Sequence, residues 1–206
     1  MTTITISRKL GSLGNQTAEQ IAQALGYHLV SRKIINEAAA RSGEPEVALA
    51  DIDELKLLDL RPSFRARRAY HEAVRQILQE MADEGQVVIV GRAGQWILRD
   101  RPDVLHVRIT APSPLRIERV AAAEGISTAA ARARIQSSDK TRRNYLRRNY
   151  RIDWDDAELY DLVINTTHLT ADMATTVVLA ALPNSAKPAD NVTDTPDAVT
   201  QKTARH

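Results

Sequence analysis

The sequence of 206 residues contains no cysteine. This absence excludes a disulfide scaffold, a thiol nucleophile, and metal or iron–sulfur sites with thiolate ligands. No apolar run approaches the roughly 20 residues that a membrane helix needs, and residues 1–10 lack the apolar stretch of a secretory signal. We expect a cytoplasmic protein without membrane contact, and the length suits one globular domain.

Aromatic residues are also scarce, at 4% of the chain. Their scarcity argues against stacking platforms for single-stranded nucleic acid. The five histidines have no metal-ligand spacing with nearby acids, and the G-x-S-x-G elbow of serine hydrolases is missing. We therefore expect neither a metal site built from side chains nor a hydrolase triad.

Positive charge is concentrated in one segment, although the net charge of the chain is only +2. Residues 132–151 hold eight Lys or Arg residues and a single acid, Asp139. Such a segment implies an anionic partner, either a nucleic acid or a small phosphate-bearing ligand. A solvated helix face is the other interpretation of the same pattern.

Strand-like and helix-like segments alternate along the chain. Short β-branched or continuous apolar runs predict strands at residues 3–7, 28–30, 86–90, 104–109 and 162–164. Helical spacing predicts helices at 18–25, 34–41, around 47–58, from Pro62 to near Gly85, after Pro112, from Ser127 towards Tyr150, and from Thr170. This order favours an α/β fold with a parallel sheet between helices. Residues 183–206 hold too little apolar surface to fold, so we expect a disordered tail.

The loop at residues 8–14, between the first strand and the first helix, is a candidate phosphate cradle. Ligands of parallel α/β folds lie beyond the carboxyl ends of the strands. Gly11 and Gly14 permit close backbone approach, Ser12 offers a hydroxyl, and Arg8 and Lys9 add two cations. The helix that follows presents free N–H groups. An ordinary tight turn would show the same glycines.

Further cations follow at other strand ends. Gly91-Arg92 comes directly after the third strand, where an arginine can hold phosphate with both nitrogens. Arg116 and Arg119 share one helix face after the fourth strand, and Asp139 and Arg142 lie three residues apart in the basic segment. Taken singly, each of these is equally consistent with a surface residue.

As a set, these motifs resemble the cytidylate-kinase-like family, whose relatives are the P-loop nucleoside monophosphate kinases. The resemblance covers roughly residues 3–182. It rests on Ile6-Ser7-Arg8-Lys9-Leu10-Gly11-Ser12-Leu13-Gly14, Gly26-Tyr27, Ser31-Arg32, Val90-Gly91-Arg92, Ser138-Asp139 to Arg142 with Tyr145, and Tyr160-Asp161-Leu162-Val163-Ile164-Asn165-Thr166.

The resemblance implies a three-layer P-loop kinase fold with a five-stranded parallel sheet over residues 1–182. It also implies a helical segment at about 31–85 that binds the monophosphate, and an arginine-rich lid at about 127–156. The implied activity is phosphorylation of a nucleoside monophosphate, CMP or dCMP in the first place, by direct transfer from ATP with Mg²⁺. The implied partner is thus a small nucleotide. Nucleic acid is not expected, and the oligomeric state is left open.

The resemblance also assigns candidate roles to particular residues. Candidates for catalysis are Arg142, Asp139, Arg134 and Lys9. Candidates for binding ATP are Ser7, Arg8, Gly11, Ser12, Gly14, Asn15, Gln16, Arg116 and Arg119. Candidates for binding the acceptor are Ser31, Arg32, Arg41 and Arg92.

The loop nevertheless departs from the standard pattern G-x-x-x-x-G-K-[ST]. Arg8 stands at the first glycine, Leu13 at the second and Gly14 at the lysine, and the magnesium-binding hydroxyl falls near Asn15 or Gln16. Acids that typically flank the Gly-Arg pair are replaced by Val90 and Ala93. Two hypotheses follow. Either Arg8 or Lys9 replaces the missing lysine, or the protein is a nucleotide-binding regulator that has lost efficient kinase activity.

Overall fold

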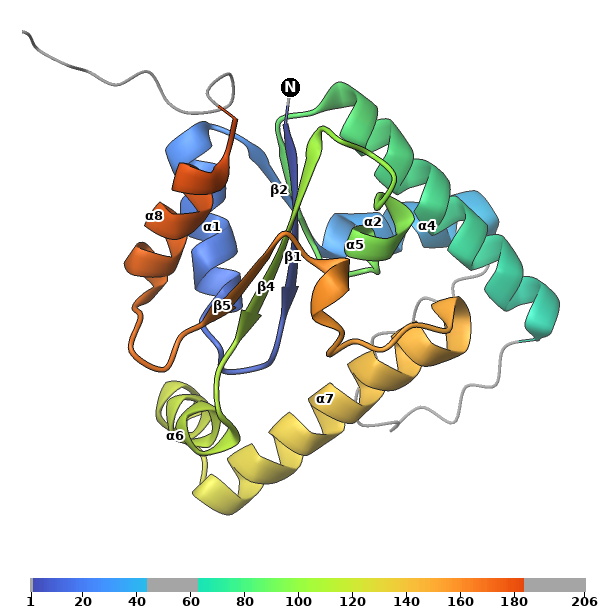
Figure 1. Cartoon of the computed structure of the whole chain (residues 1–206). Coiled ribbons are helices and arrows are strands. Elements are labelled where there is room, and N and C mark those ends of the chain that lie inside the picture. The colour runs from blue at the N-terminus through green and yellow to red at the C-terminus, as the bar shows by residue number, and fades with distance from the viewer. Residues whose placement is uncertain (1, 44–62, 184–206) are drawn as a thin grey trace, which may run out of the picture.

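A parallel β-sheet forms the centre of the molecule, as a computed structural model of the chain shows (Figure 1). The structure describes residues 2–43 and 63–183. Within them, five strands pair in the order β2-β3-β1-β4-β5. The strands are β1 (Thr3–Arg8), β2 (His28–Val30), β3 (Val87–Val90), β4 (Val104–Thr110) and β5 (Leu162–Asn165). The α/β fold with five parallel strands is therefore confirmed.

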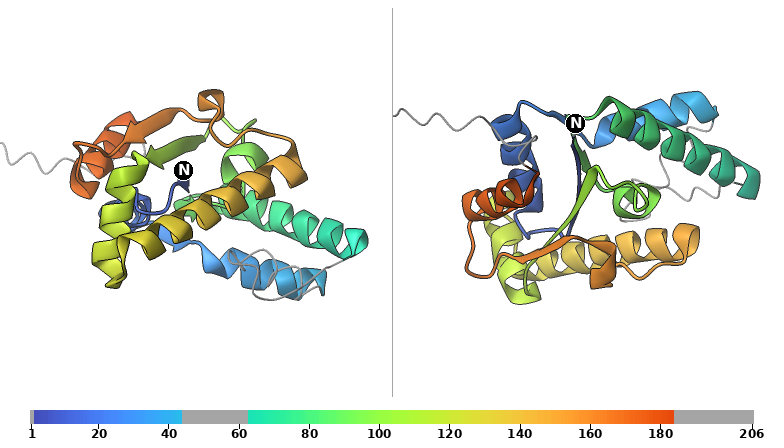
Figure 2. Two further views of the ribbon diagram at one scale, coloured as in Figure 1. Left: turned by 90° about the horizontal axis from the view of Figure 1, so that it is seen from below. Right: turned by 45° about the horizontal axis from the view of Figure 1, so that its top comes forward.

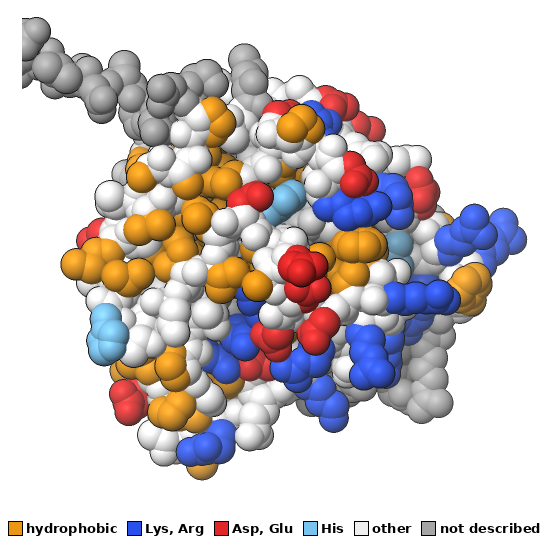
Figure 3. Space-filling model, in the orientation of Figure 1, with side chains coloured by type: hydrophobic (Ala, Val, Ile, Leu, Met, Phe, Trp, Pro, Cys, Tyr) orange, Lys and Arg blue, Asp and Glu red, His pale blue; other side chains and the backbone are white. Residues whose placement is uncertain are grey.

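Helices cover both faces of this sheet (Figures 1 and 2). One face carries α1 (Gly14–Leu25) and α8 (Ala171–Ala181), and the other carries α2 (Arg32–Ser42), α4 (Phe64–Glu84) and the short α5 (Gly94–Ile97). Two further helices, α6 (Ser113–Glu124) and α7 (Thr128–Tyr150), extend from the end of the sheet where β1 and β4 finish. Figure 3 shows Lys and Arg side chains gathered over the lower right of the face that it draws, where α7 lies. A 3₁₀ turn (Ala157–Leu159) leads from α7 into β5.

Side-chain alternation in the strands creates two cores. Ile4 and Ile6 of β1 pack with α1 and α8, and Val88 and Val90 of β3 join the same cluster. Val87 and Ile89 point the other way, into a cluster with α2 and α4. Because both faces are covered, nearly every position of the central strands is buried.

Helix ends follow the caps that the sequence predicts. The side chains of Ser127 and Thr170 accept hydrogen bonds from the backbone N–H groups of Ala130 and Met173, which confirms the starts of α7 and α8. Helix α4 starts after Ser63, which caps it in the same way, and ends before Gly85. The helix expected around 47–58, Pro62, and the tail from residue 184 onward lie outside the described residues.

Two elements differ from the sequence prediction. Helix α1 begins at Gly14 rather than near residue 18, so its first turn is part of the glycine loop itself. Helix α5 is a single turn after β3 that the sequence did not predict. No helix of the described ranges is long and apolar enough to cross a membrane.

Candidate active site

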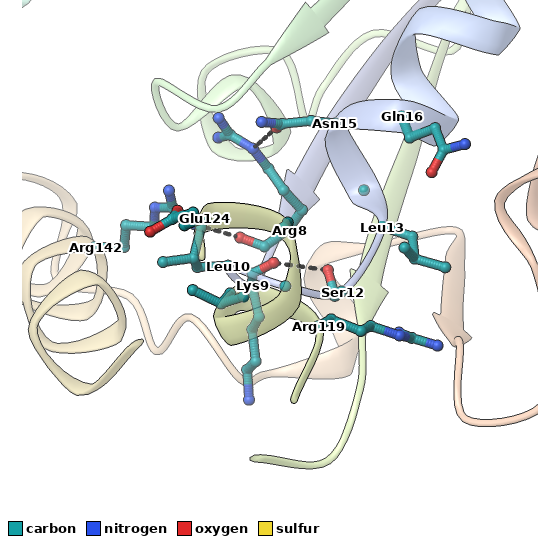
Figure 4. A pocket seen from close by; sticks show the side chains of 14 residues that line it. Arg8, Lys9, Leu10, Ser12, Leu13, Asn15, Gln16, Arg119, Glu124 and Arg142 are labelled. Atoms are coloured by element: carbon teal, nitrogen blue, oxygen red, sulfur yellow. Dashed lines mark hydrogen bonds between the residues drawn. The ribbon is translucent and has the colours of Figure 1, made fainter. Parts of the chain in front are cut away.

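A pocket of about 260 Å³ lies beyond the carboxyl end of β1 (Figure 4). The loop after β1 and the first turn of α1 form one wall, α6 forms another, and one side chain comes from α7. The lining residues are Arg8, Lys9, Leu10, Gly11, Ser12, Leu13, Gly14, Asn15, Gln16, Arg119, Val120, Ala123, Glu124 and Arg142. This is where a parallel α/β fold places its ligand.

The loop backbone has the shape of an anion cradle. Gly11 has φ +77° and Leu13 has φ +64°, so two of its residues are left-handed. Leu13 occupies the N-cap of α1 but makes no side-chain cap hydrogen bond. The first N–H groups of a helix lack intrahelical acceptors and carry its positive dipole end. The first turn, Gly14 to Gln16, therefore offers an uncapped helix N-terminus to the pocket.

Position 11 requires glycine for two reasons: its φ is left-handed, and helix α6 lies too close for a side chain. An ideal Cβ at this position would lie 2.7 Å from the carbonyl oxygen of Arg116 on α6. The loop can therefore pass α6 only with glycine here.

Ser12 lines the pocket, but its hydroxyl is engaged by backbone carbonyls, and Ser7 lies outside the pocket. The Ser12 side chain is fully buried, and its hydroxyl donates towards the carbonyl oxygens of Lys9 (2.7 Å) and Ile109 (3.1 Å). Ser7 is also buried and does not line the pocket. Its Oγ accepts from Trp154 Nε1 at 2.9 Å and from Arg108 at 3.2 Å, because alternation along β1 turns residue 7 to the other face of the sheet.

Arg116 joins the loop to the lid helix. Its guanidinium donates to both carboxylate oxygens of Asp139 on α7, at 3.2 and 2.8 Å, and to the carbonyl of Leu10 at 3.1 Å. Only 5% of the Arg116 side chain and 16% of the Asp139 side chain are exposed. In this conformation Arg116 does not line the pocket, and Asp139 orients Arg116 rather than Arg142.

Arg119 and Arg142 do line the pocket. Arg119 donates to the hydroxyl and the carbonyl of Thr166, at 3.0 and 2.8 Å. Arg142 reaches from α7 and donates to the carbonyl oxygen of Arg8 at 3.0 Å. Arg134 does not itself line the pocket; it forms an ion pair at 3.0 Å with Glu124, which does, and 56% of its side chain is exposed.

Asp155, which the sequence analysis did not single out, is the acceptor for three cations. Its carboxylate contacts Arg108 of β4 at 2.6 Å, Lys9 of the loop at 3.0 Å and Arg143 of α7 at 3.3 Å. Burial raises the pKa of Asp155, but the hydrogen bond from Lys9 and the nearby positive charges outweigh burial, so the pKa lies below its usual value. The acidic run 153–156 after a basic helix was the available sequence signal.

Arg108 is the second residue that sequence reasoning missed. It is 3% exposed and lies over the ring of Trp154, 4.5 Å from the ring centroid, while Tyr160 also contacts it. A charged residue in an otherwise apolar strand was the signal. The segment that follows α7 is held against β1 and β4 by a network of Ser7, Arg108, Trp154, Asp155 and Tyr160.

The comparisons with known proteins agree with this arrangement. A family model described as the cytidylate kinase-like family matches residues 3–168. The chain belongs to the cytidylate kinase-like family. Among curated relatives, a cytidylate kinase of Methanopyrus kandleri is 30% identical over 189 residues, covering 87% of this chain and 92% of the relative. A cytidylate kinase of Ignicoccus hospitalis is 32% identical over 166 residues, covering 81% and 90%.

Solved structures show the same fold at lower sequence identity. A protein of Eubacterium ventriosum matches with a TM-score of 0.68 and 22% identity, covering 87% of this chain and 97% of that one. A gluconokinase of Sinorhizobium meliloti matches with a TM-score of 0.53 and 16% identity, covering 87% and 90%. These likenesses concern the fold alone.

The expected acceptor side of this cytidylate kinase-like protein begins at the end of β3. Gly91, Arg92 and Ala93 have φ values of +84°, +55° and +58°, so two non-glycine residues are held in a strained conformation. The turn carries Arg92 to the lid helix, where its guanidinium lies 5.8 Å from the centroid of the Tyr145 ring.

Two other acceptor candidates, Arg41 and Ser31, do not line the pocket. Arg41 forms an ion pair with Glu80 of α4 at 2.8 Å, and both side chains are about half exposed. Ser31 is exposed at the start of α2 and forms no side-chain cap hydrogen bond. Arg32 is the first residue of α2.

An aromatic cluster connects α4 with the lid helix. His71 contacts the rings of Tyr70, Tyr145 and Tyr150, with centroids 5.5, 5.7 and 6.2 Å away. Burial, together with the positive charges of Arg67 and Arg92, lowers the pKa of His71 to about 4. His71 is therefore neutral at neutral pH.

The described residues do not provide a ready magnesium site. They contain no group of three or more His, Cys, Asp or Glu side chains that could hold an ion. Asn15 stands where the standard loop has its hydroxyl, and its Oδ1 accepts from Arg8 Nε at 2.9 Å. Asp139 and Asp155 are both paired with arginine. The residues present thus do not fit direct coordination of Mg²⁺ by side chains.

Proposed function

We propose that this protein transfers the γ-phosphate of ATP to a nucleoside monophosphate. The observation that carries the proposal is the pocket itself: an uncapped helix N-terminus meets Arg8, Arg119 and Arg142 from three different elements. Phosphoryl transfer requires mainly positioning and stabilisation of negative charge. An arginine-lined anion pocket in a member of this family suits that reaction.

The two nucleotides would bind on opposite sides of the β1 end. The ATP phosphates fit the loop and the first turn of α1, where backbone N–H groups and the helix dipole attract anions. The acceptor phosphate would lie towards Arg92, since β3 is the neighbour of β1 and ends beside the loop. The transferring group would then pass between them.

The lid supplies Arg142 and helps to exclude water. Closure of a lid over the phosphates suppresses hydrolysis and completes the set of charges around the transferring group. We propose that Mg²⁺ enters bound to the ATP phosphates and keeps most of its waters, which is common for this ion.

CMP or dCMP is the proposed acceptor because several curated relatives at about 30% identity are cytidylate kinases. Base recognition would involve the segment at about 31–85, of which residues 44–62 lie outside the described part of the chain.

A product assay with an acceptor panel tests this function. Purified protein is incubated with Mg-ATP and CMP, dCMP, UMP, AMP or GMP, and diphosphates are separated and quantified, with a no-acceptor control for hydrolysis. We expect CDP or dCDP to form fastest. ATP binding without formation of any diphosphate would instead favour a nucleotide-binding regulator. That alternative is supported by the absence of the loop lysine and of the carboxylates that typically flank the Gly-Arg pair.

A further inference from the structure

Arg8 lies across the space that the loop lysine occupies in the standard motif. An ideal Cβ on Gly14 would lie 3.0 Å from Arg8 Cγ and closer still to Arg8 Cβ. Real Cβ atoms essentially never come closer than 3.0 Å to another atom, and the two nearest atoms belong to the stem of Arg8 rather than to its flexible end. Ile109 Cβ follows at 3.2 Å, a tight contact that a small shift relieves. A lysine at position 14 is therefore incompatible with an arginine at position 8.

A second glycine makes room for the other end of the same side chain. An ideal Cβ on Gly91 would lie 2.8 Å from Arg8 Nη1. The guanidinium thus extends from the loop towards the end of β3, immediately before Arg92. It lies between the expected ATP phosphates and the expected acceptor, where charge develops during transfer.

Asn15 and Arg142 fix the position of Arg8. Asn15 Oδ1 accepts from Arg8 Nε at 2.9 Å, and Arg142 donates to the backbone carbonyl of Arg8 at 3.0 Å (Figure 4). Leu13 stands at the second glycine of the motif and is left-handed, with φ +64°, a conformation that glycine adopts most readily.

Lys9, the other candidate for the missing cation, is held in a different place. Its Nζ is 3.0 Å from Asp155 and lies over the ring of Trp154, 5.7 Å from the centroid. In Figure 4 the Lys9 side chain points away from Asn15, whereas Arg8 points towards it. Lys9 contributes to the pocket lining, but its ammonium would have to leave this carboxylate to bind a phosphate there.

Resting on the proposed function, we infer that Arg8 supplies the phosphate-binding cation of the missing lysine and that Gly14 is its obligatory partner. Compared with the standard motif, the cation stands at the end of β1, as Arg8, and the glycine stands at the start of α1, as Gly14. A guanidinium can hold two phosphate oxygens at once, which a lysine ammonium cannot do in the same fixed geometry.

The inference predicts that the effect of a lysine at residue 14 depends on residue 8. We expect Arg8→Gly to weaken ATP binding by about 10- to 100-fold, the range for hydrogen bonds to charged groups. Gly14→Lys alone should also lose affinity, because the new side chain collides with Arg8. In the Arg8→Gly background, Gly14→Lys should instead raise ATP affinity at least about tenfold, since it recreates the ordinary pair.

Two control variants are needed. One separates the charge of the lysine at position 14 from the space that its side chain fills, and the other tests whether the loss of any positive charge weakens ATP binding. Arg8→Gly combined with Gly14→Ala fills the same space without a charge and should not recover ATP affinity. Arg99→Ala removes one partly exposed arginine that does not line the pocket and should leave ATP affinity unchanged. Melting temperatures identify any variant that fails to fold.

The readout is the affinity for ATP relative to AMP, measured by titration calorimetry, with turnover as a second readout. The inference would be overturned if Gly14→Lys changed the ATP affinity equally in the wild-type and Arg8→Gly backgrounds. It would also be overturned if Lys9→Ala lowered the ATP affinity and Arg8→Gly did not. Because the cycle is read by binding, it remains decisive if no acceptor is phosphorylated, an outcome that would contradict only the proposed function.

Discussion

Arg116 of α6 and Asp139 of α7 form a two-pronged ion pair, and the same guanidinium donates to the carbonyl of Leu10 in the loop. One buried side chain thus links three parts of the site: the loop, α6 and α7. Helix α7 also contacts the loop through the hydrogen bond from Arg142 to the Arg8 carbonyl.

Asp139→Ala should destabilise the protein strongly. It leaves the Arg116 guanidinium buried without its carboxylate, and breaking a buried pair costs about 3–5 kcal/mol. Urea unfolding measures the change. Glu80→Ala is the matched control, because its pair with Arg41 is half exposed and should contribute no more than about 1 kcal/mol. Equal losses in the two variants would contradict the role assigned to the buried pair.

Gly11→Ala should cost more than left-handed strain alone. The new Cβ would meet the Arg116 carbonyl, whereas Gly125, with a similar φ of +64°, has no atom within 4 Å of its ideal Cβ. We expect Gly125→Ala to lose about 1–2 kcal/mol, the left-handed penalty, and Gly11→Ala to lose more and to weaken ATP binding. Unfolding and ATP titration of the two variants test this, and indistinguishable behaviour would count against the close approach of loop and α6.

His71→Phe should change how stability depends on pH. The folded pKa of His71 is about 4, against an ordinary value of 6.5. Between these values the unfolded chain binds more protons, so His71 makes the wild type less stable as pH falls from 6.5 towards 4. Phenylalanine keeps the aromatic contacts but cannot take up the proton.

Urea midpoints at pH 7.5 and 4.5 measure this difference. We expect the wild type to lose more stability than His71→Phe over that interval. The pKa of His106 is also lowered by burial, so some dependence should remain in the variant. Identical losses in wild type and variant would show that His71 is not buried in its neutral form.

Arg142→Ala should reduce turnover far more than stability. Loss of an arginine that stabilises the transferring phosphoryl group costs about 10³-fold or more in rate, while the folded protein loses polar contacts such as the hydrogen bond to the Arg8 carbonyl. Arg132→Ala, exposed on the same helix, is the control for charge. Steady-state kinetics and thermal unfolding separate the two effects, and an unchanged rate would remove Arg142 from the mechanism.

Local pattern was sufficient to predict the sheet, most helices and the position of the pocket. The alternation of Ile4 and Ile6, the apolar run before Gly91, and the capping residues Ser127 and Thr170 act over a few residues. Their physical effect is therefore readable from the sequence. Because β1 lies in the middle of the sheet between β3 and β4, the loop after β1 lies beside the arginines that follow β4, Arg119 and Arg142.

The directions of individual side chains could not be predicted in the same way. Whether Ser12 faces a phosphate or the carbonyl of Ile109 depends on a strand 97 residues away. The partners of Asp155 likewise come from β4, the loop and α7. Such contacts are determined by the packed fold, and a single sequence shows only that the charges exist.

Transfer of the label from γ-³²P-ATP tests the central claim most directly. The protein is incubated with labelled ATP, Mg²⁺ and CMP, and the products are separated by thin-layer chromatography, with Arg142→Ala as the control for contaminating kinases. The account predicts label in CDP with the wild type and about 10³-fold less with the variant. Label that stays in ATP or appears only as inorganic phosphate, with every monophosphate offered, would contradict it.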